Sequence, residues 1–262
     1  MSPICHSPKN RRGYEFASPL RSWQHDKMAK RALAWIRHGE YSQPPGVPSA
    51  HLPYGLTPRG RDQARSAAHA VWAHAREQRL ELAPVVDCSS LLRAWETATL
   101  LVDELRAAGG PTLTVEQFDA LAERSLGAAA NLSVEQIEAV LASDPRHEVP
   151  PRGWKRDPLY RLPFPGAESL EEAGRRVFTH VLERMRSSSA VVPTLKLFVG
   201  HGGAFRHAAQ RGGLLTPVQV HELSMDYGLP IYFEQSGEGA DGERLAHVAG
   251  NWKRRSEAAP LD

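Results

Sequence analysis

The chain has 262 residues, of which 41% are hydrophobic and 24% charged, a composition typical of a globular protein with a sizeable core. Its 32 basic and 30 acidic residues leave a formal net charge of +2, so no nucleic-acid partner is expected. The two cysteines, Cys5 and Cys88, are too few for a disulfide framework. No apolar run reaches the ~20 residues that cross a bilayer, and the N-terminus lacks the apolar segment of a secretory signal. We therefore expect a cytoplasmic protein with no membrane partner.

The first part of the chain changes from an irregular segment to a periodic one. Residues 1–29 carry Pro, Ser, Arg and His without periodicity, and we expect them to form a disordered extension. A strand is predicted over Ala32 to Ile36, followed by a polar loop from Glu40 to about Leu56. Thr57-Pro58 then predicts a helix N-cap with proline in the first turn. Apolar residues recur at helical spacing after it: Ala64, Ala67, Ala68, Val71, Trp72 and Ala75.

The rest of the chain alternates short apolar runs with amphipathic segments. Strands are expected in the apolar runs: Val85 to Cys88, Leu113 to Phe118, Leu195 to Val199 and, as edge strands, Ile231 to Glu234 and Leu245 to Val248. Helices are expected between them: Leu91 to Ala107, Val134 to Leu141 after the cap-like Ser133, Glu168 to Arg186, Gly202 to Gly212 and a short one after Thr216-Pro217. Residues 144–166, rich in Pro, Arg and aromatics, are predicted to be an ordered insertion loop. This alternation favours an α/β fold over residues 30–262, with three α/β/α layers around a mostly parallel sheet.

The segment Arg37-His38-Gly39 follows the first predicted strand. In an open α/β sheet, ligands bind outside the carboxyl ends of the strands. Arg37 can hold a phosphate in a bidentate fork, and its charge would keep the imidazole of His38 neutral, which is the nucleophilic form. Gly39 would let the backbone approach a ligand closely. Taken alone, a histidine satisfied by hydrogen bonds in an ordinary turn explains this motif equally well.

Three further segments follow predicted strands in the same way. Gly200-His201-Gly202-Gly203 comes after a buried strand, and a helix that begins near Gly202 would offer free N–H groups to an anion. Arg93 lies in the first turn of a predicted helix, where a surface salt bridge is the ordinary role of an arginine. Glu123 follows the third strand. A carboxyl group beside a phosphate is costly unless it carries a proton, and a protonated carboxyl is a general acid; an exposed Glu paired with Arg124 is the alternative.

Six segments in one order resemble the histidine phosphatase superfamily, in the branch shared by cofactor-dependent phosphoglycerate mutases and small-molecule phosphatases. They are Arg37 to Glu40, Leu56 to Ala64, Ser90 to Ala98, Leu121 to Gly127, Gly166 to Ser169, and Gly200 to Gly203. Single motifs of this kind are weak, but six in order over residues 32–213 are specific. The resemblance implies a phosphoglycerate mutase-like α/β/α fold.

The resemblance also implies a role for each matched position. His38 would be the nucleophile that becomes phosphorylated, and Arg37, Arg93 and His201 would bind the transferred phosphoryl group. Glu123 would donate and accept the proton, and the backbone N–H of Gly202 would add a donor. No metal is implied, and no cofactor except 2,3-bisphosphoglycerate if the chain is a mutase. The expected partners are a small phosphorylated substrate and a second copy of the chain in a homodimer.

Two regions bear on which reaction the family fold would carry out. Members of the family usually continue the first motif with Ser or Thr and then Trp-Asn, whereas this chain reads Tyr41-Ser42-Gln43-Pro44-Pro45. The asparagine contact is lost or replaced, with Ser42 and Gln43 as candidates, and this argues against a strict mutase. The basic and aromatic insertion is a counterweight, because a mutase holds its acidic substrate with such a region. Candidate substrate-binding cations are Arg124, Arg152, Lys155 and Arg156, and a solvated loop is the alternative.

Three interpretations therefore stay open. The first is a metal-independent phosphomonoesterase acting through a phosphohistidine on a small phosphorylated metabolite. The second is phosphoglycerate mutase-type phosphoryl transfer, which differs in how well water is excluded from the phosphohistidine. The third is a catalytically inactive regulatory or binding member. The last is disfavoured, because all the residues that the resemblance assigns to catalysis are present.

Overall fold

The computed structural model describes residues 1, 30–187, 192–236 and 244–255. The extension expected over residues 1–29 lies outside these described residues, apart from Met1. One central sheet has the strand order β3-β2-β4-β1-β6-β7. Its strands are β1 (Arg31–Arg37), β2 (Glu81–Ser89), β3 (Thr114–Phe118), β4 (Thr194–Gly200), β6 (Pro230–Ser236) and β7 (Arg244–Ala249). Strands β1, β2, β3 and β4 pair in parallel, whereas β6 is antiparallel to both of its neighbours, β1 and β7. The expected mostly parallel sheet is therefore confirmed.

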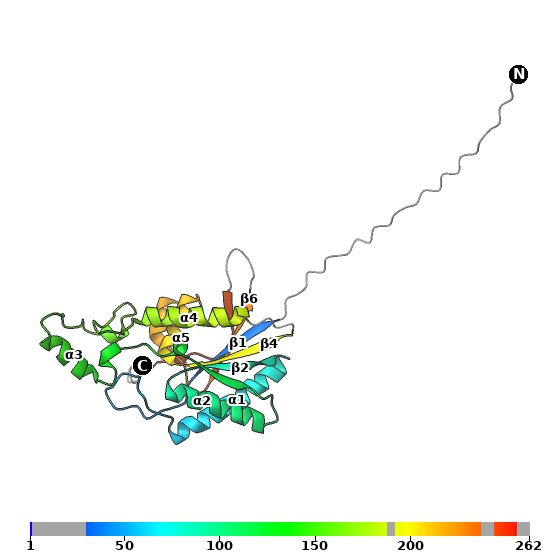
Figure 1. Ribbon diagram of the computed structural model, residues 1–262, viewed down its shortest axis with the longest axis horizontal. Coiled ribbons are helices and arrows are strands. Elements are labelled where there is room, and N and C mark those ends of the chain that lie inside the picture. The colour runs from blue at the N-terminus through cyan, green and yellow to red at the C-terminus, as the bar shows by residue number, and fades with distance from the viewer. Residues whose placement is uncertain (2–29, 188–191, 237–243, 256–262) are drawn as a thin grey trace.

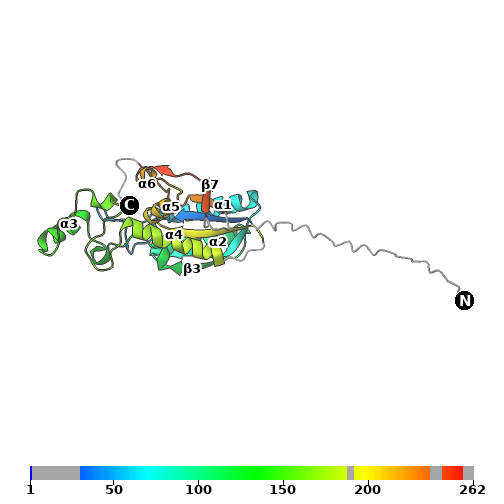
Figure 2. The same cartoon turned by 90° about the horizontal axis from the view of Figure 1, so that it is seen from above.

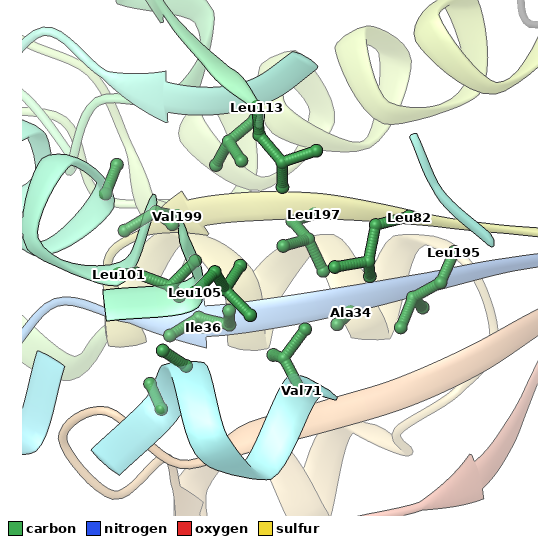
Figure 3. Packing of buried hydrophobic residues seen from close by; sticks show 14 of the residues in the cluster. Ala34, Ile36, Val71, Leu82, Leu101, Leu105, Leu113, Leu195, Leu197 and Val199 are labelled. Atoms are coloured by element: carbon green, nitrogen blue, oxygen red, sulfur yellow. The ribbon is translucent and has the colours of Figure 1, made fainter. Parts of the chain in front are cut away.

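Helices cover both faces of this sheet, which confirms the three layers (Figure 1). The helices are α1 (Pro58–Glu77), α2 (Leu92–Ala107), α3 (Val134–Ser143), α4 (Leu170–Ser187), α5 (Gly202–Arg211) and α6 (Pro217–Glu222). Alternate residues of β1 enter two cores: Ala34 and Ile36 pack on the side of α1 and α2 (Figure 3), whereas Leu33 and Trp35 pack on the side of α4 and α5. A strand buried on both faces holds its carboxyl end in a fixed place.

Side-chain caps fix the starts of three helices. The Thr57 hydroxyl accepts the N–H of Gly60 at 3.0 Å at the start of α1. Ser133 and Thr216 each form a capping box at the starts of α3 and α6. All three caps were expected from a Ser or Thr directly before a helical pattern, and the structure confirms them. Within the described residues, no helix combines the length and the apolar character that a bilayer span requires.

The sheet differs from the sequence prediction in three places. The prediction of β6 as an edge strand is wrong, because β6 lies between β1 and β7 with both faces covered. Strand β2 begins at Glu81, earlier than the predicted Val85, and its pairing with β4 carries a register shift between Leu82 and Val86. A second sheet pairs β5 (Leu223–Ser224) with β8 (Lys253–Arg254). Strands of two residues leave no periodic pattern in a sequence.

The predicted insertion, residues 144–166, packs with α3 around a small core of its own. Buried apolar residues from the two segments and their neighbours form this core: Ala50, Leu126, Ala129, Ile137, Leu141, Trp154, Leu162 and Ala167. The insertion carries a single 3₁₀ turn, Trp154–Arg156. Figures 1 and 2 place α3 beyond the carboxyl ends of the parallel strands. The insertion therefore stands at the end of the sheet at which a ligand would bind.

Candidate active site

The two strand-terminal histidines lie side by side. Strands β1 and β4 are parallel neighbours, with Arg37 opposite Gly200, so His38 and His201 leave the sheet at the same level. Their ring centroids are 5.0 Å apart, and both residues are buried. The backbone N–H of His38 donates to the carbonyl of Gly200 at 2.9 Å. The adjacency that the repeated His-Gly motif required is thus present.

The imidazole of His38 is held in one tautomer. Its Nδ1 lies 2.7 Å from the carbonyl oxygen of Gly39. Because a carbonyl oxygen can only accept, Nδ1 carries the proton and Nε2 keeps its electron pair. Burial first, and then the charges of Arg93 and Arg37, hold the pKa of His38 well below its usual range. Burial therefore contributes more to the neutral imidazole than the neighbouring cation to which the sequence pointed.

Arg93 reaches the nucleophile from the first turn of α2. Its Nε donates to His38 Nε2 at 3.2 Å. The other guanidinium nitrogens donate to the carbonyls of Ser49, Ala50 and Leu52 at 2.8 to 3.1 Å. The side chain is fully buried, so the surface salt bridge considered for this residue does not form. The loop after β1 therefore fixes a cation against the unprotonated nitrogen of His38.

Arg37 approaches the same point from the end of β1. Its Nη1 donates to the carbonyl of Met225 at 2.9 Å. Gly202 begins α5, and a Cβ at that position would lie 3.2 Å from Arg37 Cδ and Nε. As the first residue of the helix, Gly202 has an N–H with no intrahelical acceptor. A guanidinium and a helix N-terminus thus converge beside His38, a combination that suits an anion.

His201 has one satisfied ring nitrogen and one unsatisfied. Its Nε2 lies 2.8 Å from Ser89 Oγ, which already accepts the N–H of Leu91 at 3.2 Å. When the Ser89 hydroxyl donates to Nε2, the proton of the neutral ring lies on Nδ1. Among the described residues, the buried Nδ1 has no hydrogen-bond partner. A buried donor without an acceptor is costly, and a bound phosphoryl oxygen would satisfy it.

Glu123 lies buried at the same edge. Its Oε1 accepts the N–H of Arg124 at 2.9 Å, and its Oε2 accepts the N–H of Gly203 at 3.1 Å. His51 Nε2 lies 2.9 Å from the carbonyl oxygen of Glu123. With 4% exposure, Glu123 is not the solvent-exposed glutamate that the sequence left open. Backbone bonds on both oxygens hold the carboxyl group beside the first turn of α5.

The structure gives Gly39 a reason that the sequence did not show. A Cβ on Gly39 would lie 2.3 Å from the carbonyl oxygen of Gly60, in the first turn of α1. The close approach of that helix by itself requires a glycine here. The Gly39 N–H donates to Thr97 Oγ1 at 3.0 Å, and the Thr97 hydroxyl donates to the carbonyl of Arg93 at 2.7 Å. Thr97 thus links the backbone after His38 to the helix that carries Arg93.

A family model of the histidine phosphatase superfamily (branch 1) matches residues 33–243, which is most of the chain. This chain belongs to that superfamily. A 2,3-bisphosphoglycerate-dependent phosphoglycerate mutase of Brucella ovis is 28% identical over 213 residues, covering 79% of this chain and 94% of the relative. The same description and identity apply to the relative from Brucella canis.

Solved structures share the fold at lower identity. The structure titled mycobacterial hydrolase 2 has a TM-score of 0.65 and 23% identity, covering 88% of this chain and 94% of its own. The native mycobacterial glucosyl-3-phosphoglycerate phosphatase has a TM-score of 0.60 and 23% identity, covering 83% and 97%. The alpha-ribazole phosphatase from Shigella flexneri has a TM-score of 0.58 and 21% identity, covering 83% and 95%. These likenesses show a histidine phosphatase fold.

The candidate substrate-binding residues do not form one cluster in this histidine phosphatase. Gln43 and Lys155 line the same cavity of about 420 Å³, between the loop after β1 and the insertion. The Gln43 amide donates to the carbonyl of Val47 at 2.8 Å within its own loop. Arg124 is buried with its Cζ 5.9 Å from the ring of Trp154.

The remaining three candidates, Ser42, Arg152 and Arg156, are exposed. A larger cavity of about 640 Å³ lies along α4, and none of the catalytic candidates lines it. Its larger volume is therefore no reason to place the active site there instead of at His38. Among the described residues, no three His, Cys, Asp or Glu side chains converge as metal ligands.

Two tyrosines beside the nucleophile were not predicted. The ring of Tyr41 is 5.3 Å from that of His38, and the ring of Tyr227 is 5.6 Å from it. Tyr41 follows the first motif directly. A tyrosine where the family usually has Ser or Thr could have indicated that this side chain lies at the site. Tyr227 lies outside all six motifs, in the turn before β6, and only the pairing of β6 with β1 brings it to the site.

Proposed function

We propose that this chain is a metal-independent phosphomonoesterase that forms a phosphohistidine on His38. The observation that carries the proposal is the bond from His38 Nδ1 to the carbonyl of Gly39, which leaves Nε2 unprotonated beside Arg93. A neutral imidazole in that tautomer is a nucleophile. Fixed cations beside it suit the charge that spreads over the oxygens of a transferring phosphoryl group.

The reaction proceeds in two displacements at phosphorus. His38 Nε2 attacks in line, the bond from phosphorus to the ester oxygen breaks, and Glu123 gives its proton to the leaving oxygen. Arg37, Arg93 and His201 Nδ1 hold the three remaining oxygens. Glu123 then takes a proton from water, the water oxygen attacks phosphorus, and the phosphorus–nitrogen bond breaks to release inorganic phosphate. The substrate in this proposal is a small phosphorylated metabolite.

Two observations support water as the acceptor. The asparagine that usually follows the first motif is absent, and Gln43, a candidate to replace it, bonds within its own loop. The insertion cations Arg152 and Arg156 are exposed. Phosphoglycerate mutase-type transfer is the second candidate, because the curated relatives named above are mutases. That reaction would need 2,3-bisphosphoglycerate as cofactor.

The test is hydrolysis of p-nitrophenyl phosphate in EDTA by the wild type, His38→Ala and the control His69→Ala, which alters an exposed histidine. We expect turnover that EDTA does not affect, a loss of about 10³-fold or more in His38→Ala and full activity in the control. A base-stable, acid-labile phosphoenzyme should form in the wild type and in the control, but not in His38→Ala. Unchanged turnover in His38→Ala would reject the hypothesis that His38 is the nucleophile. A wild type without turnover or phosphoenzyme would favour an inactive binding member.

A second assay separates the two activities. Incubation with 3-phosphoglycerate, with and without 2,3-bisphosphoglycerate, is followed for inorganic phosphate and for 2-phosphoglycerate. The phosphatase proposal predicts phosphate release that does not depend on the bisphosphate. Isomerisation that appears only with the bisphosphate, at a rate above phosphate release, would favour the mutase.

A further inference from the structure

A segment far from the first motif in sequence holds Arg37. Residues 225–228 follow β5 and precede β6. The Met225 carbonyl accepts from Arg37 Nη1 at 2.9 Å, and the N–H of Gly228 donates to the backbone carbonyl of Arg37 at 2.9 Å. The ring of Tyr227 lies over the guanidinium, with the Arg37 Cζ 4.0 Å from the ring centroid. Three successive parts of this segment therefore touch one arginine.

The position of the guanidinium over the ring is favourable, because a cation is attracted to the face of an aromatic ring, and this attraction holds the side chain of Arg37 in place. A Cβ on Gly202 would lie 3.2 Å from the Cδ and Nε of Arg37, so the backbone of Gly202 packs closely against the same side chain. The ring of Tyr227 is half-buried and lies 5.6 Å from the ring of His38. The plane of Arg37 is thus confined next to the nucleophile.

The other arginine of the site is held in the same manner. Arg93 Cζ lies 4.6 Å from the ring centroid of Tyr41, and the Tyr41 hydroxyl donates to Ser49 Oγ at 2.9 Å. The Cζ of each of the two arginines thus lies over the ring of one tyrosine, and the two tyrosines come from different parts of the chain.

We propose that Tyr227 is a positioning residue for phosphate binding, acting through Arg37. The proposal rests on the proposed function, since it takes the space beside His38 as the phosphoryl site. A flexible arginine loses conformational freedom when it binds an anion, and a side chain already confined by a stacked ring loses less. Removal of the ring should therefore weaken the binding of a phosphate group, while removal of the hydroxyl alone should not.

The segment is itself tied to the end of the described chain. Asp226 pairs with Lys253 at 3.1 Å, and β5 pairs with β8 directly before the segment begins. Lys253 lies beyond the residues that the family model matches. The turn that presents Tyr227 is thus braced by a part of this chain outside the shared family region.

The experiment measures inorganic phosphate binding to the full chain by calorimetry. Tyr227→Leu should raise the phosphate Kd about 5- to 30-fold, the range expected for a cation–π contact that is mostly removed from water. Tyr227→Phe should stay within about twofold because the ring is retained. Tyr54→Leu, which alters an exposed tyrosine of the loop after β1, is the matched control and should also stay at the wild-type value.

A double-mutant cycle separates positioning from general damage to the fold. In an Arg37→Gln background, Tyr227→Leu should add no more than about twofold to the Kd, because the residue through which it acts is gone. An equal loss in both backgrounds, a loss in Tyr227→Phe that matches Tyr227→Leu, or no loss in Tyr227→Leu would each overturn the proposal. Phosphate binding can be measured without turnover. If the chain formed no phosphohistidine, the proposed function would be rejected, and the phosphate Kd of these variants would still test the role of Tyr227.

Discussion

The edge of the sheet around His38 and His201, called the edge below, and the insertion both contain cationic residues, but these differ in exposure. At the edge, His38, Arg93, Glu123 and His201 are all at most 4% exposed. In the insertion, Arg152 and Arg156 are exposed, Lys155 is buried, and the residues that form the core of the insertion are apolar. Charges in a buried site interact strongly, whereas exposed charges more than about 10 Å apart are screened by salt. From this comparison we expect the cations at the edge, not those of the insertion, to act on a bound phosphoryl group.

The two regions also differ in what holds their side chains. Three side chains at the edge are held by backbone groups of other segments or of the next residue: the Gly39 carbonyl for His38, three loop carbonyls for Arg93 and two N–H groups for Glu123. In the insertion, Arg146 bonds Asp144 two residues away, and both of these side chains reach solvent. Backbone partners move only when an element moves. The edge is therefore preorganised, and substitutions there should cost far more than in the insertion.

The largest effect is expected from Glu123→Gln, which keeps the shape of the side chain and removes the carboxyl group proposed for proton transfer. Turnover of an alkyl phosphate such as 3-phosphoglycerate should fall ~10²–10⁴-fold, the usual contribution of a general acid. Formation of the phosphoenzyme from p-nitrophenyl phosphate should slow less than about tenfold, because its leaving group departs without a proton. Rapid-quench kinetics of phosphoenzyme formation with both substrates checks this, since this step precedes the attack of water for which Glu123 also acts as base. An equal loss with both substrates would remove Glu123 from the role of proton donor.

The next effect compares a glycine from each region. Gly39→Ala should lower the free energy of unfolding by about 1–3 kcal/mol or more, since its Cβ would meet the Gly60 carbonyl oxygen. Gly153→Ala in the insertion has no atom within 4 Å of the new Cβ, but its φ of +79° should cost about 1 kcal/mol. Urea denaturation measures both.

Activity gives a second readout for the same pair. Gly39→Ala should also lose most p-nitrophenyl phosphate turnover, because the Gly39 carbonyl orients His38, whereas Gly153→Ala should keep it. An active and stable Gly39→Ala would mean that α1 yields easily and that the edge is less rigid than proposed.

The sequence predicted the edge well because its signals are local. A buried strand followed by His-Gly, twice, determines both the strand ends and the residues that leave them. Thr57, Ser133 and Thr216 predicted helix starts for the same reason, since a cap involves residues only two or three apart. Family motifs added Arg93 and Glu123, which no periodicity would have chosen from the other arginines and glutamates.

Contacts between distant segments could not be predicted. Tyr227 reaches His38 because β6 pairs with β1, and a short apolar run does not specify its neighbours. The prediction of β6 as an edge strand was wrong for the same reason. Gly39 was explained by a ligand because the sequence does not show that α1 passes within contact of it. Lys155 and Arg156 are consecutive, yet one lines a cavity and the other is exposed, a difference that composition does not carry.

A smaller effect is expected on stability in mild acid. Burial lowers the pKa of His207 to about 3 and lowers the pKa of His38 and His201 well below the usual range. The unfolded chain takes up these protons near pH 6.5, whereas the folded chain does not. The free energy of unfolding should therefore fall as the pH drops below 6.5, by up to about 1.4 kcal/mol per pH unit for each histidine.

Variants assign this slope to the buried region. His207→Gln should flatten the fall between pH 6.5 and 5, and His147→Ala, which alters a half-buried histidine of the insertion, is the comparison variant. Urea denaturation at several pH values measures it. A slope that stays the same in His207→Gln would show that His207 is not a source of the acid sensitivity.

The smallest effect is expected where the sequence suggested a substrate grip. Arg152→Ala/Arg156→Ala should change kcat/KM less than about threefold for both p-nitrophenyl phosphate and 3-phosphoglycerate, because exposed charges are solvated and screened. The control Arg65→Ala/Arg106→Ala removes the same charge from α1 and α2. If KM rose tenfold for 3-phosphoglycerate alone, and only in the insertion variant, the insertion would bind the acidic leaving group. The edge would then bind the phosphate group, and the insertion would select the leaving group to which the phosphate is attached.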